Sequence, residues 1–178
     1  MMQEKLYLKA LTEADAQTVA DYCAEFPAER MRVTYNAERI PGLDHLEAFE
    51  SIAEWLAFCK EMCGKITWYM TVRERDGKAV GFICFRHSLA YDDDDPEFAS
   101  HFGYSVRPSE RRKGYAKAQL RLCLEQARRS GLETVRLVCR DLNTGSIRTI
   151  LANGGVYVDT LFGEESGMYI ERYDIPLV

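Results

Sequence analysis

The sequence predicts a mixed α/β fold: a mostly antiparallel central sheet, flanked by helices, that contains one parallel strand pair. Three observations predict it. Apolar and polar residues alternate from Leu6 as in a strand, Asp76-Gly77 is a tight-turn dipeptide between two apolar segments, and a strand, an amphipathic helix and a strand follow one another over 98–139. Two strands joined through a helix form a right-handed crossover, so we expect that pair to be parallel or nearly so.

The composition is that of a single globular domain spanning residues 1–178. Apolar residues make up 47% of the chain and charged residues 29%, which excludes collagen-like and disordered classes. No apolar segment approaches the roughly 18 to 20 residues that cross a bilayer, and the N-terminus lacks a secretory segment, so we expect a cytoplasmic protein without a membrane partner. The net charge of −5 gives no overall attraction to nucleic acid.

The first half of the chain combines two helices with a hairpin. Thr12, followed three residues later by Asp15, resembles a capping box that opens a helix, and Gly64 is a typical helix terminator. From Ile66 the hydrophobic period changes from that of a helix to that of a strand. The expected elements are a strand at 6–8, helices over 12–26 and 44–62, and hairpin strands over 66–75 and 78–88.

The second half contains the crossover and closes with another hairpin. Pro108 cannot continue a strand, and Gly131 is a suitable cap for the long helix before it, whose apolar face includes Leu120 and Leu124. The expected elements are strands over 98–106 and 135–139, helices over 113–130 and 144–152, and hairpin strands over 156–162 and 168–175.

Six cysteines are scattered along a chain with no export signal, which indicates free thiols rather than a disulfide framework. Only Cys59 and Cys63 come close in sequence. Their spacing of four places both on one face of the expected helix, together with Ile52 and Leu56, so we expect both to be buried. Further ligands at metal-binding spacing are missing, and we expect no metal site.

A basic cluster at Arg111, Arg112 and Lys113 lies between the strand that ends at Val106 and the next helix. A helix N-terminus after a strand offers unpaired backbone N–H groups and the positive end of the helix dipole, and both attract phosphate. Gly114 allows the backbone to approach a ligand closely. Cations at a helix N-terminus are unfavourable without an anion, which favours a diphosphate site over a cluster that only raises solubility.

The segment 103–116, Gly-Tyr-Ser-Val-Arg-Pro-Ser-Glu-Arg-Arg-Lys-Gly-Tyr-Ala, resembles the acyl-CoA-binding motif of the GNAT superfamily of N-acetyltransferases. The core of that motif is Arg/Gln-x-x-Gly-x-Gly/Ala, which Arg111, Gly114 and Ala116 fill. Asn143 and the Gly-terminated helix after it resemble the later part of the same fold, and the order of elements over the whole chain also matches. More narrowly, the chain is similar to a subgroup of predicted bacterial acetyltransferases.

The resemblance implies that acetyl-CoA binds in a wedge where the strands over 98–106 and 135–139 splay apart. The pantetheine amides would pair with the backbone of that first strand, the pyrophosphate would lie on the basic turn, and an acceptor amine would attack the thioester directly, without a covalent enzyme intermediate. The coenzyme-binding residues implied in this way are Tyr104, Val106, Arg111, Arg112, Lys113, Gly114, Tyr115, Ala116, Asn143 and Ser146.

The sequence specifies the residues for proton transfer less clearly than those for coenzyme binding. An alkylamine with a pKa near 10.4 is largely protonated at neutral pH, so a proton acceptor is useful. His101 is the first candidate, because it lies on the strand beside the thioester and titrates near neutrality, and Glu97 is the second; the alternative for each is a purely structural role. Many family members have a tyrosine acid where this chain has Ile150, so Tyr157 or Tyr104 would replace it, or the thiolate would leave without side-chain help.

These features together predict an acetyl-CoA-dependent N-acetyltransferase acting on a primary amine of a small molecule or peptide. The acidic segment Asp92–Asp95 would attract a cationic acceptor, or else is a solvated loop, and Trp55 and Trp68 are expected in the core. Because Ile150 replaces the tyrosine, a non-catalytic acyl-CoA-binding regulatory module is the alternative. The basic patch is too short for nucleic-acid binding. The sequence leaves both a monomer and a homodimer open.

Overall fold

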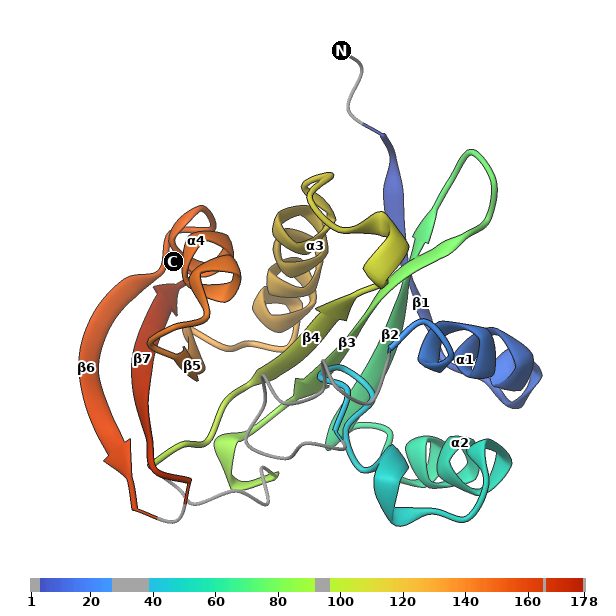
Figure 1. Cartoon of the computed structure of the whole chain (residues 1–178), viewed down its shortest axis with the longest axis horizontal. Coiled ribbons are helices and arrows are strands. Elements are labelled where there is room, and N and C mark those ends of the chain that lie inside the picture. The colour runs from blue at the N-terminus through green and yellow to red at the C-terminus, as the bar shows by residue number, and fades with distance from the viewer. Residues whose placement is uncertain (1–3, 27–38, 92–96, 165, 178) are drawn as a thin grey trace.

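The computed structural model describes residues 4–26, 39–91, 97–164 and 166–177. Its strands form two antiparallel sheets, one in the order β1-β2-β3-β4 and the other in the order β5-β7-β6 (Figure 1). The strands are β1 (Leu6–Ala10), β2 (Ile66–Arg73), β3 (Ala79–Arg86), β4 (Phe102–Val106), β5 (Thr134–Arg140), β6 (Val156–Gly163) and β7 (Met168–Pro176). Both predicted hairpins, β2 with β3 and β6 with β7, are confirmed.

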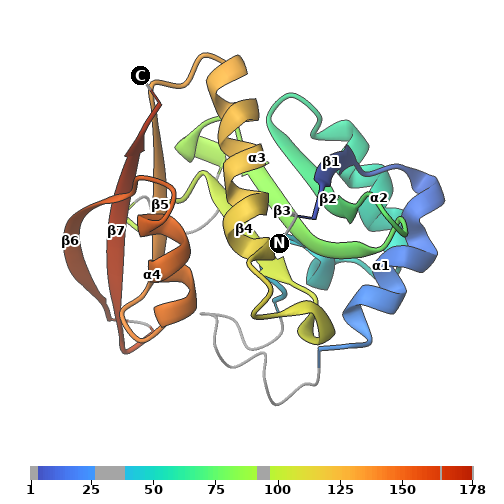
Figure 2. The ribbon, with the colours of Figure 1, turned by 90° about the horizontal axis from the view of Figure 1, so that it is seen from above.

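Helices cover both faces of the first sheet. They are α1 (Ala16–Cys23), α2 (Ile52–Glu61), α3 (Tyr115–Arg129) and α4 (Thr144–Leu151). Helices α1 and α2 lie on one face and α3 on the other, with α4 beside α3 and the second sheet (Figures 1 and 2). Each side has its own core: Trp55 and Trp68 are buried on the first, as expected, and Leu120 and Ile150 on the second.

The first helices differ from their predicted lengths. The capping box forms, with the backbone N–H of Thr12 donating to Asp15 at 2.9 Å, but it opens a short 3₁₀ turn before α1. The helix predicted over 44–62 is wrong in its first part. His45 has a left-handed backbone, with φ of 71°, which an α-helix cannot include, and α2 begins only after Ser51, whose hydroxyl accepts from the Glu54 N–H.

The two neighbouring cysteines are not equivalent. Cys59 is buried in the core on α2, as predicted, but Cys63 is exposed, so that part of the prediction is wrong. The reason is that α2 ends at Glu61, and position 63 lies in the following turn instead of on the buried helix face. All six cysteines are free thiols.

The sheets meet at one residue and then separate. The backbone N–H of His101 donates to the carbonyl of Arg136 on β5 at 2.9 Å, and its carbonyl accepts from the N–H of Arg86 on β3 at 2.8 Å. Beyond this point β4 and β5 share no ladder in the described residues, as expected of a splayed strand pair. The strand predicted over 98–106 therefore starts late, at Phe102, because the residues before it cross between the sheets.

Candidate active site

The turn before α3 is open to a ligand. Arg112 and Gly114 have positive φ angles of 65° and 83°, so the backbone curls and α3 begins at Tyr115 instead of at the predicted Lys113. Within the described part of the chain, the N–H groups of residues 112–114 make no backbone hydrogen bond, and a Cβ added to Gly114 would meet nothing within 4 Å. Free N–H groups at a helix N-terminus, facing open space, suit an anion.

The three cations of this turn are held differently. The Nζ of Lys113 donates to Glu110 at 2.7 Å, so a carboxylate already balances its charge. The guanidinium of Arg111 lies 5.4 Å from the centre of the Phe26 ring. Arg112 is exposed, and neither arginine forms an ion pair with the described residues. Arg111 and Arg112 therefore have the charge that remains available to an anionic ligand.

Glu110 anchors the turn from inside the protein. Its buried carboxylate accepts from Lys113 and Lys78, both at 2.7 Å, and from Arg73 at 3.0 Å. Burial opposes its ionisation, but these hydrogen bonds outweigh that effect and lower the pKa of Glu110 to about 2. The hydroxyl of Tyr115 accepts from Arg73, so its side chain is part of this support and only its backbone faces the turn.

β4 presents an open edge toward the second sheet. One side of the strand pairs with β3, with Tyr104 opposite Ile83, while residues 103–106 stay partly exposed. Unpaired N–H and C=O groups on a strand edge can bind an extended chain that contains amides. At the end of the edge the Val106 carbonyl accepts from the Nε of Arg111 at 3.2 Å, and Ala116 follows in the first turn of α3, so the edge leads directly to the open turn.

Three of the predicted coenzyme-binding residues meet at the start of α4. The hydroxyl of Tyr104 lies 2.8 Å from that of Ser146, and the side-chain oxygen of Asn143 caps α4 by accepting from the Ser146 N–H at 3.1 Å. Burial raises the pKa of Tyr104, which keeps its hydroxyl protonated. Cys139 on β5 lies beside Ser146, and burial raises the pKa of its thiol to about 11.

His101 is held by the junction of the two sheets. Its ring Nδ1 accepts from the backbone N–H of Arg136 at 2.9 Å, so the neutral ring carries its proton on Nε2. Burial lowers the pKa of His101, which disfavours the charged ring. The lone pair that a general base would use is therefore already engaged in a structural hydrogen bond.

The other catalytic candidates lie apart. Glu97 is exposed, and its backbone carbonyl accepts from Arg172 on β7 at 3.4 Å. Tyr157 is 52% exposed on β6, where its hydroxyl contacts Thr160 at 2.8 Å. Among the described residues, no hydrogen bond joins Tyr157 to His101. The acidic segment Asp92–Asp95 lies outside the described residues.

Ile150, at the position of the family's tyrosine, belongs to the core. It is fully buried, and its side chain packs where a Cβ on Gly155 would lie, only 2.4 Å away. The face of α4 toward β4 carries Ser146 instead, which contacts Tyr104. Position 150 therefore supplies no hydroxyl here, but the Tyr104 hydroxyl reaches α4 from β4.

A buried ion pair that sequence reasoning did not single out as a pair lies on the α1/α2 face of the first sheet. The Oδ2 atom of Asp44 is 3.2 Å from the Nη2 atom of Arg86, and both side chains are about 5% exposed or less. No local pattern marks Asp44, because it precedes α2 in an irregular segment. Its position against β4 becomes apparent only in the folded chain.

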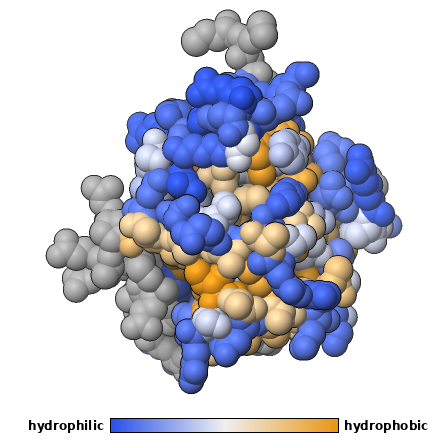
Figure 3. Space-filling view, turned by 90° about the vertical axis from the view of Figure 1, so that its right-hand side faces the viewer, coloured by the Kyte–Doolittle hydropathy of each residue, from blue (hydrophilic) through white to orange (hydrophobic). Residues whose placement is uncertain are grey.

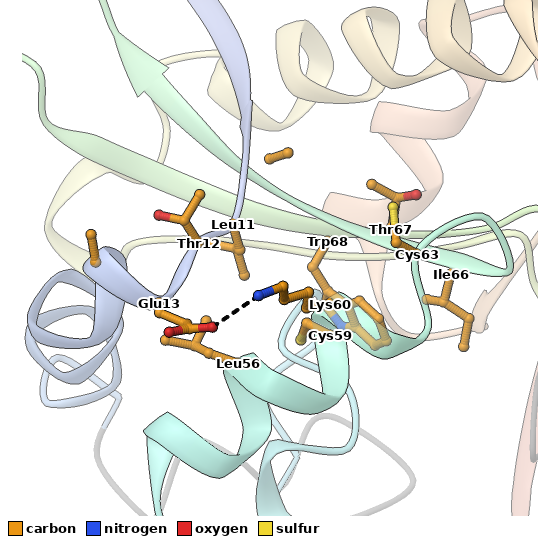
Figure 4. Close-up of a pocket in the computed structure, with 12 residues that line it drawn as sticks. Leu11, Thr12, Glu13, Leu56, Cys59, Lys60, Cys63, Ile66, Thr67 and Trp68 are labelled. Carbon is orange, nitrogen blue, oxygen red and sulfur yellow. Dashed lines mark hydrogen bonds and ion pairs between the residues drawn. The ribbon is translucent and has the colours of Figure 1, made fainter.

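A separate cavity of about 440 Å³ lies at the opposite edge of the same sheet, where β1 ends beside α2. Leu11, Leu56 and Trp68 form apolar walls, and Lys60 and Glu13 pair at 3.3 Å (Figure 4). Figure 3 shows apolar side chains surrounded by hydrophilic ones on this side of the molecule. None of the predicted site residues lines this cavity.

The comparisons with known proteins agree with this geometry. A family model described as the acetyltransferase (GNAT) family matches residues 20–154, more than half of the chain. The chain belongs to the GNAT acetyltransferase family. The matched range includes the open turn and α4, and it confirms the resemblance that the segment 103–116 predicted. No curated protein matches the chain.

Solved structures with the fold of this GNAT acetyltransferase include three with distinct descriptions. A ribosomal-protein-S5-alanine acetyltransferase from Vibrio fischeri has a TM-score of 0.74 at 16% identity, covering 99% of this chain and 95% of that one. A putative acetyltransferase from Salmonella typhimurium, yncA, with acetyl-CoA, has 0.69 at 15%, covering 97% and 94%. An aminoglycoside acetyltransferase with coenzyme A and kanamycin has 0.69 at 14%, covering 97% and 95%.

The described residues contain no group of three or more His, Cys, Asp or Glu side chains placed to hold a metal ion. None of the helices in the described ranges is long and apolar enough to cross a membrane.

Proposed function

We propose that this GNAT acetyltransferase moves an acetyl group from acetyl-CoA directly to a primary amine of a small molecule or peptide, with the whole chain acting as one domain. The observation that carries the proposal is the open edge of β4 leading to the free N–H groups before α3. A coenzyme with two amides and a diphosphate matches these two features in that order. The aminoglycoside acetyltransferase structure with kanamycin, among the similar structures, supports an amine acceptor.

In this proposal, acetyl-CoA is held more by backbone groups than by side chains. The pantetheine amides pair with the β4 edge between Tyr104 and Val106, and the diphosphate accepts from the N–H groups of the turn. Arg111 and Arg112 add charge-assisted hydrogen bonds, each worth about 1.5 to 3 kcal/mol. Asn143 and Ser146 contact the pantetheine arm from the start of α4. Glu110 keeps this turn in place through Lys113, Lys78 and Arg73.

The chemical step needs a proton donor for the departing thiolate. The amine nitrogen bonds to the acyl carbon, the carbon–sulfur bond breaks with its electron pair leaving on sulfur, and the nitrogen releases one proton to solvent as the amide forms. Tyr104 is the residue best placed to donate, because it lies on the strand beside the thioester and its raised pKa keeps the hydroxyl protonated. His101 instead holds the sheets together, since its Nδ1 lone pair is occupied by Arg136.

A thiol-release assay with acetyl-CoA and a panel of primary amines tests the proposal. We expect release that depends on at least one amine. The double variant Arg111→Ala with Gly114→Val should abolish coenzyme binding in calorimetry while unfolding stays cooperative. Coenzyme binding without release above hydrolysis for any amine would favour the regulatory module, which the core position of Ile150 keeps as the second candidate.

A further inference from the structure

The cavity where β1 ends beside α2 is bordered by a buried donor that lacks an acceptor. The indole Nε1–H of Trp68 has no hydrogen-bond partner among the described residues, although this side chain is only 2% exposed. Figure 4 shows the ring nitrogen on the side of the indole that faces Cys59, which lines the same cavity. Because the large majority of buried polar groups are paired, an unpaired donor beside a cavity points to an acceptor on a bound molecule.

The other tryptophan of the chain is the natural comparison. Trp55 lies in the same core, with its ring centre 6.2 Å from that of Trp68, and its Nε1 donates to the backbone carbonyl of Asp44 at 3.0 Å. Trp55 is not among the described residues that line the cavity. The indole whose N–H lacks a protein acceptor is therefore the one that borders open space.

The walls of the cavity fit an apolar molecule. Leu11, Leu56 and Ile66 line it together with the indole of Trp68. The cavity volume is about 440 Å³, whereas apolar cavities of about 150 Å³ are large enough to bind benzene. A substituted aromatic ring therefore has room here, and its burial against these side chains favours binding.

The other polar side chains of the cavity favour a neutral ligand. The hydroxyls of Thr12 and Thr67 are hydrogen-bonded to Asp15 and His87, each at 2.9 Å. Lys60 is exposed and already forms an ion pair, so its charge stays in solvent. An anionic group beside the buried indole would lose its hydration without gaining a cation, whereas a neutral carbonyl oxygen has much less hydration to lose.

We propose that this cavity binds a neutral, apolar small molecule, such as an aryl ketone, through one oxygen atom that accepts from the Nε1–H of Trp68. The site is separate from the one that we assign to the coenzyme, because the cavity lies at β1 and β2, and β3 lies between β2 and β4. The inference goes beyond the proposed transfer reaction and does not depend on it.

The probes are acetophenone and α-methylstyrene, which have the same planar shape but differ in one group, because a CH₂ replaces the carbonyl oxygen. The chain has two tryptophans, so its proton–nitrogen NMR spectrum contains two indole signals, which Trp55→Phe and Trp68→Phe assign. We expect acetophenone to move the Trp68 signal to higher proton frequency. It should bind about threefold to tenfold more tightly than α-methylstyrene, the effect of one neutral hydrogen bond.

Three variants separate the donor from the space around it. Trp68→Phe removes the N–H but keeps an aromatic ring, and it should abolish the preference for acetophenone. Trp55→Phe is the matched control, because its N–H is already paired, and it should keep the preference. Ala14→Phe adds a ring at an exposed position that lines the cavity, and it should weaken both probes about tenfold or more. Urea unfolding checks that each variant is folded.

Each contrary result overturns the inference. An unmoved Trp68 signal at saturating acetophenone would mean that the cavity holds solvent only. Equal affinities for the two probes in the unchanged protein, or a preference retained by Trp68→Phe, would mean that the indole N–H does not select the ligand. Undiminished binding to Ala14→Phe would place the probes outside the cavity. These comparisons decide the question even if Trp68→Phe does not fold, and none uses acetyl-CoA, so the proposed transfer reaction is tested separately.

Discussion

The hydroxyl of Tyr104 on β4 lies 2.8 Å from the hydroxyl of Ser146 on α4, so one hydrogen bond spans the gap between the open strand edge and the second half of the protein. These residues are 42 positions apart in the chain. Because this gap is where the donor thioester is proposed to lie, the pair is the most direct place to test the chemistry.

Replacing Tyr104 by Phe should slow transfer without weakening coenzyme binding. We expect kcat to fall about 100-fold, the effect of losing a positioned general acid, with little change in the Kd of coenzyme A. Steady-state thiol release and calorimetry measure the two quantities. Ser146→Ala is the control, since it removes the partner but keeps the acid, and its kcat should change much less. Equal losses of kcat in the two variants would contradict the assignment.

Replacing His101 by Ala should lower stability before it affects proton transfer. The substitution leaves the partly buried N–H of Arg136 without its acceptor, and we expect the free energy of unfolding to fall by about 1 to 3 kcal/mol in urea titrations. Glu97→Gln, at an exposed position, should change stability much less. An unchanged stability combined with a lost alkaline rise of the rate would instead identify His101 as the base.

Replacing the different cations of the turn should weaken the binding of coenzyme A to different degrees. Arg112→Ala removes an exposed, unbalanced charge, and we expect the Kd of coenzyme A to rise about tenfold. Lys113→Ala is the matched comparison. Because Lys113 is balanced by Glu110, its loss should weaken binding less. The difference should shrink at high salt, where exposed charges are screened. The opposite ranking in calorimetry would show that the Glu110 pairing opens on binding.

Glu110 should make stability depend on acidic pH. The ordinary pKa of a glutamate is about 4.3, and in the folded protein the Glu110 value is about 2. Since the folded pKa is the lower one, the stabilisation is complete above the ordinary value and is lost as the pH falls toward about 2. We expect Glu110→Gln to cost on the order of 2 kcal/mol at pH 7 and to flatten the curve between about pH 5 and 3.

Urea titrations at pH 7, 5 and 3 measure this dependence. Asp159→Asn is a useful comparison, because that carboxylate is also paired with an arginine but lies at the surface of β6. Its removal should change stability little. Parallel stability curves for the unchanged protein and Glu110→Gln would mean that the buried network does not depend on this charge.

The sequence by itself determined the order of the elements and the place of the coenzyme turn. Both are local properties: the hydrophobic period changes at Ile66, and Arg111, Gly114 and Ala116 fall within one short segment. The same local reasoning failed at 44–62, where His45 interrupts the helix. Amphipathic spacing says which face a helix would bury, but it does not say where the backbone leaves helical geometry.

Only the tertiary structure decided what the candidate catalytic side chains do. His101 was predicted to act as a base, but Arg136, 35 residues later, occupies its lone pair, and Asp44 pairs with Arg86, 42 residues later. Such contacts depend on strand register and on how an irregular segment lies on a sheet. Strand register and the placement of an irregular segment are both set by packing between residues far apart in the chain, so local periodicity does not predict them.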